Sequence, residues 1–232
     1  MKKTLLSILV GGMTMALAAC GGVDATNPDS LKDNAISAAE DNVELTDDAI
    51  LGKYPSLLKQ QSVAFDTLKA FCREAEDKIK VEDLSDLEDA FKESKKINDA
   101  RKEARKAIEE YFGSKIDEAC KDLIGKEYPT EVDNKQYSAA KATIAKASDE
   151  GLTLDVELTL AARLSGTIDD HKYIKFEIRN AAGECLSPGA TVVRPVTQGI
   201  NDEAGGKFTV QVLVNSSMIK DDAAKIYFEE DD

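Results

Sequence analysis

The sequence predicts an α+β protein in which an N-terminal antiparallel helical hairpin is followed by an all-β sandwich. Two observations predict this order. Apolar residues recur every three or four positions between residues 51 and 127, as on one face of a helix. After Pro129 they recur at every second position, as in half-buried strands, and Gly-, Pro- and Asn-rich turns separate the segments. The expected units are therefore a helical hairpin over 51–127 and a β domain over 130–232.

The chain begins with a short basic region, Lys2 and Lys3, followed by an apolar stretch over residues 5–15. This layout is typical of a secretory signal. A transmembrane helix needs about 20 apolar residues, and this stretch is shorter. We therefore expect residues 1–19 to be a signal peptide that is removed from the mature protein.

The signal ends in Leu17-Ala18-Ala19-Cys20-Gly21, which resembles the lipobox of bacterial lipoproteins. The resemblance implies diacylglyceryl transfer to Cys20, cleavage after Ala19 and fatty acylation, such as palmitate, of the new N-terminus. It implies a lipid-anchored protein of the cell envelope that faces the periplasm or the cell exterior. Gly21 stands where an Asp often marks retention in the inner membrane, which favours the outer membrane if the source is Gram-negative.

Residues 20–50 are expected to form an acidic tether. Eight acidic residues stand against one basic residue, Lys32, and the apolar residues are scattered, so the segment should bury little surface. A short helix from Pro28 to Glu40 is allowed within it. Asn27 can cap such a helix, and Pro28 suits its first position.

The hairpin is expected to have a longer second helix than first. The apolar face of the first helix comprises Tyr54, Leu58, Gln61, Phe65, Leu68, Cys72, Ala75 and Ile79. Ser85 and Glu88 have the spacing of a capping box, which would start the second helix. The second helix is expected to bury Leu87, Phe91, Ala104, Ile108, Tyr111 and Phe112. The pair Gly113-Ser114 indicates a kink or a restart within it.

Alternation of apolar and polar residues predicts the strands of the second half. The segments with this alternation, or with a strand-like composition, are 152–160, 174–178, 208–214, 191–196 and 225–229. Pro195 within 191–196 places that strand at an edge.

Residues 135–148 are ambiguous, because their Ala content suggests a helix. The turn Asp149-Glu150-Gly151 that follows suggests instead a hairpin with Gly151 at a positive φ, and we favour a strand. Counting it gives six or seven strands over about 100 residues, the size and rhythm of an immunoglobulin-like sandwich. The Cys-Trp-Cys pattern of such domains is missing, so this interpretation depends on the strand count alone.

Cys72, Cys120 and Cys185 remain beyond Cys20. An odd number of cysteines in an exported protein leaves at least one thiol free. Cys72 and Cys120 lie on apolar helical faces and are expected to be small buried hydrophobic residues. The alternatives are a Cys120–Cys185 or a Cys72–Cys120 disulfide. A catalytic thiol is not expected, because His171 is the single histidine.

No catalytic, cofactor-binding or metal-binding residue is expected. The sequence contains no nucleophile elbow, P-loop, dinucleotide-binding motif, zinc-protease motif or C-x-x-C pair. His171 follows Asp169 and Asp170 in an expected turn, and zinc would need more nitrogen or sulfur ligands there. The acidic end, Glu229–Asp232, is expected to be solvated.

The net charge of −14 becomes −16 when the signal leaves with Lys2 and Lys3. Such a surface repels nucleic acid, so nucleic-acid binding is not expected. The expected partner is the lipid bilayer, through acylated Cys20, and the sequence does not identify a protein partner. We expect a non-enzymatic interaction or scaffold module. The alternatives are an enzyme or enzyme subunit with a site between hairpin and sandwich, and a cation- or peptide-binding periplasmic protein.

Overall fold

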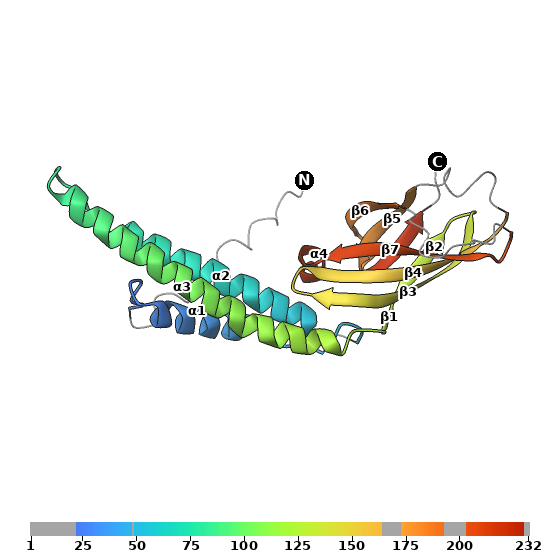
Figure 1. The fold of residues 1–232 in the computed structure, drawn as a ribbon, viewed down its shortest axis with the longest axis horizontal. Helices are drawn as coiled ribbons and strands as arrows, with labels where there is room; N and C mark the ends of the chain where they lie inside the picture. Colours follow the sequence, from blue (N-terminus) through green and yellow to red (C-terminus); the bar gives the residue numbers. More distant parts are fainter. Residues whose placement is uncertain (1–21, 48, 164–172, 193–202, 230–232) are drawn as a thin grey trace, which may run out of the picture.

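The computed structural model describes residues 22–47, 49–163, 173–192 and 203–229. Three long helices come first: α1 (Pro28–Asn42), α2 (Tyr54–Glu76) and α3 (Asp86–Lys121). The strands follow: β1 (Glu127–Tyr128), β2 (Thr130–Asp133), β3 (Tyr137–Ser148), β4 (Gly151–Leu160), β5 (Tyr173–Asn180), β6 (Cys185–Val192), β7 (Lys207–Asn215) and β8 (Ala223–Glu229). A short helix, α4 (Ser216–Lys220), lies between β7 and β8. Figure 1 shows a helical arm that carries the sheets at one end.

The predicted fold class is wrong in both halves. The helical half is not a two-helix hairpin, because α1 packs along both α2 and α3 as a third helix (Figure 1). The second half is not an all-β immunoglobulin-like sandwich. Its strand β2 pairs with β8 in parallel, and α4 interrupts the run of strands.

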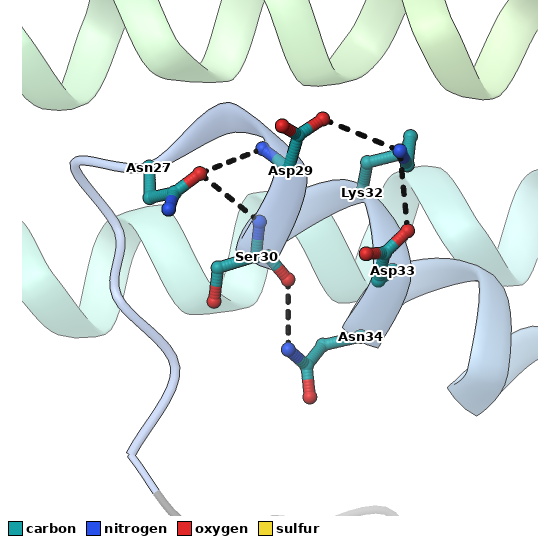
Figure 2. Close-up of polar contacts among 6 residues, drawn as sticks. All are labelled: Asn27, Asp29, Ser30, Lys32, Asp33 and Asn34. Atoms are coloured by element: carbon teal, nitrogen blue, oxygen red, sulfur yellow. Dashed lines mark hydrogen bonds and ion pairs between the residues drawn. The ribbon is translucent and has the colours of Figure 1, made fainter.

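Helix α1 lies within the segment that was expected to be a tether. Its start agrees with the sequence: the Asn27 side chain accepts hydrogen bonds from the amides of Asp29 (2.9 Å) and Ser30 (3.3 Å), and Pro28 occupies the first turn (Figure 2). The expectation that the segment buries little surface is wrong. Residues spaced four apart, Leu31, Ala35 and Ala39, are fully buried. Two of the three are alanines, so α1 can approach the other helices closely although its apolar face is small.

Helix α3 runs unbroken through Gly113, so the predicted kink or restart is wrong. A Cβ at Gly113 would meet no atom within 4 Å, so nothing at this position forces a bend. The predicted capping box is also wrong, since the side chain of Ser85 makes no cap hydrogen bond. Its hydroxyl bonds instead to the carboxylate of Asp83.

The strands form two four-stranded sheets, with the orders β1-β3-β4-β7 and β2-β8-β5-β6. All pairs except β2–β8 are antiparallel. The ambiguous Ala-rich segment is the strand β3, as favoured from the sequence. The edge strand expected over 191–196 overlaps only the last two residues of β6, which lies at the end of its sheet. Residues 193–196, with Pro195, lie outside the described residues.

The turn between β3 and β4 requires a glycine. Gly151 has a φ of 141°, and a Cβ there would lie 2.2 Å from the carbonyl oxygen of Val214 on β7. Along β4, every second residue from Leu152 to Leu160 is buried, as the alternation of apolar and polar residues predicted. These side chains belong to a single hydrophobic cluster that also includes buried residues of the helices.

Candidate interaction surface

Large apolar side chains gather at the free end of the helical arm, where α2 leads into α3 (Figure 1). Val81, Leu84, Leu87 and Phe91 are 50%, 86%, 49% and 70% exposed, and we call these four residues the tip patch. Three more exposed large apolar side chains occur elsewhere among the described residues: Leu45, Ile124 and Leu213. Exposed apolar residues that lie together mark interaction sites more often than scattered ones do.

The helical geometry explains why the tip patch is exposed. Leu87 and Phe91 are spaced four residues apart, so they share one face at the start of α3, and Leu84 lies in the turn two residues before the helix begins. Six residues separate Phe91 from buried Ile97, which at 3.6 residues per turn directs their side chains about 120° apart. The patch therefore points away from the contact between α2 and α3. The sequence-based expectation that Leu87 and Phe91 are buried is wrong for this reason.

The turn that carries the patch is held by carboxylates. The Asp83 side chain accepts a hydrogen bond from the amide of Ser85 (2.7 Å), and Asp86 accepts bonds from the amides of Glu82 (3.1 Å) and Asp83 (3.3 Å). The bonds from the hydroxyl and the amide of Ser85 lower the pKa of the Asp83 carboxyl. The turn is therefore charged at neutral pH, and its backbone donors are satisfied by side chains close in sequence.

Charges of both signs surround the tip patch. Five acidic residues lie within it: Glu82, Asp83, Asp86, Glu88 and Asp89. Lysines flank it on both sides: Lys78, Lys80, Lys92, Lys95 and Lys96. The Lys92 ammonium contacts the carboxylates of Glu88 (2.8 Å) and Asp89 (3.3 Å). The lysines thus offset the acids around the patch, although not within the turn itself.

A shallow groove of about 660 Å³ lies beside the tip patch. Ile79 on the α2 side and Ala90 on the α3 side line it together with Val23. Val23 is the second described residue of the chain, and it packs against the core. The chain therefore enters the folded body at the side of the arm, next to the segment that carries the patch.

Helix α1 is fixed to the arm by a three-residue polar cluster. The Tyr111 hydroxyl donates to the carboxylate of Glu40 (2.5 Å), and the Lys115 ammonium donates to the Tyr111 hydroxyl (2.6 Å). The hydrogen bond from Tyr111 lowers the pKa of Glu40. Burial acts to lower the pKa of Lys115, but its bonds to Tyr111 and Glu40 outweigh burial and raise it. The cluster therefore favours the charged forms of both groups and holds the C-terminal half of α1 on α3.

The junction between the arm and the sheets is closed by direct contacts. Tyr54 is fully buried, and its hydroxyl donates to the carbonyl oxygen of Ser148 on β3 (2.5 Å). Burial raises the pKa of this hydroxyl, so it remains protonated and can donate. At the surface the Lys59 ammonium lies 2.7 Å from Asp222, and Lys220 donates to the hydroxyl of Ser62 (2.9 Å). Contacts from both helices and strands thus fix the orientation of the arm.

The exposed face of the sheet that contains β5 and β8 carries a ladder of paired charges. The Arg179 guanidinium lies 3.5 Å from the centre of the Tyr227 ring and 2.7 Å from the Glu177 carboxylate. The Tyr227 hydroxyl donates to Asp133 on β2 (3.0 Å). These contacts link β2, β5 and β8, so they support the pairing of the strands.

The structure locates only some of the residues singled out from the sequence. Cys20, Asp169, Asp170 and His171 lie outside the described residues. The three described cysteines, Cys72, Cys120 and Cys185, are all free, so neither disulfide alternative is present. Cys72 and Cys120 are 1% and 5% exposed, which confirms their prediction as buried hydrophobic residues.

The described residues contain no group of three or more His, Cys, Asp or Glu side chains placed to hold a metal ion. None of the helices in that part of the chain combines the length and the apolar character needed to cross a membrane.

The tip patch was missed by sequence reasoning. Its signal was visible, because Leu84 breaks the period of α2 and precedes the pattern of Leu87 and Phe91, but the pattern was assigned to a buried face.

Comparison of the chain with known protein families, with curated proteins and with solved structures finds no significant match.

Proposed function

We propose that this protein is a bacterial lipoprotein that acts as a non-enzymatic interaction or scaffold module in the cell envelope. Acylated Cys20 anchors it to a bilayer, and the helical arm positions the sheet-bearing half. One observation carries the proposal. Val23 packs against the hydrophobic core, and it comes three residues after the cysteine of the lipobox-like sequence, so the chain reaches the core of the arm within three residues of the proposed anchor.

The distances along the chain support a positioning role. Three residues span at most about 11 Å when extended, so the anchor and the arm are close together. From there α1 runs 15 residues, or about 22 Å, towards the junction, where the Gln60 side chain donates to the Val43 carbonyl (2.7 Å). The sheets are therefore carried one helix length away from the point of attachment. A flexible acidic tether is no longer needed in this arrangement.

The contacts at the junction support a scaffold rather than a flexible linker. The buried hydrogen bond from Tyr54 to Ser148 and the ion pair between Lys59 and Asp222 fix the sheets relative to the arm. An interaction surface on either half would then be held in a constant orientation to the bilayer. The proposed location is the outer membrane, with the folded body on its periplasmic or external side, because Gly21 follows the proposed lipidated cysteine.

The anchoring step is tested by Cys20→Ala in the full chain. Intact-mass analysis of the wild-type mature protein should show an acylated N-terminal Cys20, and the variant should lack the acyl mass and keep its signal uncleaved. No other residue at this position can supply the thioether sulfur. A mature wild-type protein that begins at another residue, or that carries no acyl chain, would contradict the proposal.

The interaction role is tested by photo-crosslinking in cells. A crosslinker placed at Leu213, on the exposed side of β7, and a second one at Leu84 should each capture a fixed set of products that changes when Cys20→Ala releases the anchor. Products that are the same with and without the anchor would contradict a role in positioning at the membrane.

A further inference from the structure

The tip patch lies beside the groove that Val23 lines, and Val23 comes three positions after the proposed lipid anchor, Cys20. We propose that the tip patch is a second membrane-binding element, which rests in the headgroup region of the bilayer that holds acylated Cys20. This inference rests on the proposed lipidation of Cys20. It goes beyond that lipidation, because it assigns a bilayer-facing end to the arm and an orientation to the whole molecule.

The first step is the length of chain between the anchor and the arm. Val23 lines the groove beside the tip patch together with Ile79 and Ala90. Val23 comes three positions after Cys20, a span of at most about 11 Å. An acyl-bearing cysteine on so short a connection keeps this side of the arm at the membrane surface. Ala90 precedes Phe91 of the patch directly in α3, so the patch is brought to the same surface.

The second step is the chemistry of the patch. Leucine and phenylalanine side chains suit the boundary between lipid headgroups and acyl chains, where amphipathic helices bury their apolar faces. Leu84, Leu87 and Phe91 provide such a face at the end of a helix, and Leu84 is 86% exposed. In water these side chains have no partner among the described residues that would cover them. Contact with the bilayer would remove their apolar surface from water.

The third step is charge, which limits how deeply the patch can enter. Hydrogen bonds from Ser85 lower the pKa of the Asp83 carboxyl, and Glu82 and Asp86 add two more carboxylates to the turn. They oppose an anionic surface, whereas the flanking lysines, such as Lys92, favour it. The patch should therefore bind shallowly and should bind better to a mostly zwitterionic bilayer than to one rich in anionic lipid.

A second copy of the chain is a weaker occupant for the patch. Two tips that met face to face would place the same five acidic residues of each turn against one another, which raises the energy of contact. A separate protein partner would have to reach a surface that the short connection to Cys20 already holds at the bilayer. The bilayer is thus the occupant that agrees with both the chain length and the charge.

The chain contains no tryptophan, so a single introduced Trp reports its own surroundings. The experiment uses the mature acylated Phe91→Trp protein, reconstituted in vesicles of phosphatidylethanolamine and phosphatidylglycerol. Its matched control is Leu213→Trp, at an exposed apolar position on β7, which belongs to the sheet-bearing half (Figure 1). The emission of Phe91→Trp should shift to the blue when the protein is in the vesicles, and brominated lipid should quench it. The emission of Leu213→Trp should show neither effect. Adding Leu84→Ser and Leu87→Ser to Phe91→Trp should reduce this quenching, as should a larger share of phosphatidylglycerol.

Each other outcome contradicts a defined part of the proposal. Intact-mass analysis that finds no acyl chain would overturn the anchor, and the inference with it. An acylated protein whose Trp at position 91 is as open to aqueous acrylamide as that at position 213 would overturn the tip alone. Protection that depends on protein concentration without vesicles would indicate a second copy. Protection that needs other envelope proteins would indicate a protein partner.

Discussion

Cys72 and Cys185 show how strongly the surroundings of one residue type differ in this molecule. Cys72 is 1% exposed on α2, and burial raises the pKa of its thiol. Cys120 is similar, and burial raises the pKa of its thiol to about 11. Cys185 is exposed on the edge strand β6. The pKa of the Cys185 thiol is raised as well, so burial of the sulfur is what distinguishes the two helical cysteines and protects them from reagents.

We therefore expect alkylation of the folded protein at neutral pH to modify Cys185 first and to spare Cys72 until the protein is unfolded. Cys72→Ser should lower the free energy of unfolding by roughly 1–3 kcal/mol, because it places a hydroxyl without a partner in the interface of α2 and α3. Urea denaturation measures this loss, and mass mapping after alkylation measures the labelling. The control is Cys185→Ser, which should change stability little. Rapid labelling of Cys72 in the folded protein would contradict its role in packing.

At the level of single residues, the sequence predicts burial well where the spacing of apolar residues defines a face and another element covers that face. Leu152, Leu154 and Val156 alternate along β4 and are fully buried, since neighbouring strands lie on both sides. Leu87 and Phe91 fit a helical period equally well, yet they are exposed. A period shows which residues share a face, but not whether another element covers that face. The site was therefore visible as a pattern and misread as core.

Helix α1 is the element that most changes the picture drawn from the sequence. Its cap at Asn27 and its first residue, Pro28, follow from local chemistry, so the helix itself could be expected. Its packing against the other helices could not be expected, because two of its three buried residues are alanines and acidic residues stand on both sides of them in the sequence. Three buried positions in a run of acidic residues give a weak signal in the sequence. These positions are buried because α2 and α3 pack against them.

Tyr111→Phe tests the attachment of α1 to the arm and its pH dependence. The pKa of Glu40 in the folded protein is lowered from about 4.5, so its contribution to stability is present above pH 4.5 and is lost as the pH falls through the lowered value. The variant should cost about 1 kcal/mol or less at pH 7, because the Glu40 side chain is 43% exposed and solvent screens the interaction. Urea denaturation at pH 7 and pH 3 should show a smaller difference from wild type at pH 3.

The matched control for Tyr111→Phe is Arg105→Met, which removes the ion pair with Glu109 within α3 (2.9 Å) and the contact of the guanidinium with the Phe65 ring on α2 (5.0 Å), neither of which involves α1. Hydrogen exchange in α1 should quicken in Tyr111→Phe and stay unchanged in this control. An effect of Tyr111→Phe that is the same at both pH values would show that Glu40 does not contribute its charge.

At the level of the whole molecule, the two halves share one hydrophobic cluster and are joined through Tyr54. The change from helical to strand periodicity could be located in the sequence, and the start of α2 could be placed at Tyr54. The parallel pairing of β2 with β8 could not be read from it, because these strands lie at opposite ends of the β half. Pairing between residues so far apart is fixed by the packing of the whole sheet and leaves no local pattern.

Tyr54→Phe tests whether the arm and the sheets behave as one cooperative body. The substitution keeps the buried ring but removes the hydroxyl that donates to Ser148 at 2.5 Å, so that carbonyl loses its partner at the junction. The expected loss of unfolding free energy is about 1–3 kcal/mol. Hydrogen exchange should quicken both in the first turns of α2 and in the hairpin of β3 and β4. Lys59→Met is the control: it breaks a surface pair whose acid, Asp222, is 74% exposed, so it should cost less than about 1 kcal/mol and leave exchange in that hairpin unchanged. Faster exchange confined to α2 in Tyr54→Phe would show that the sheets are held independently of the arm, and the fixed orientation on which a scaffold depends would be lost.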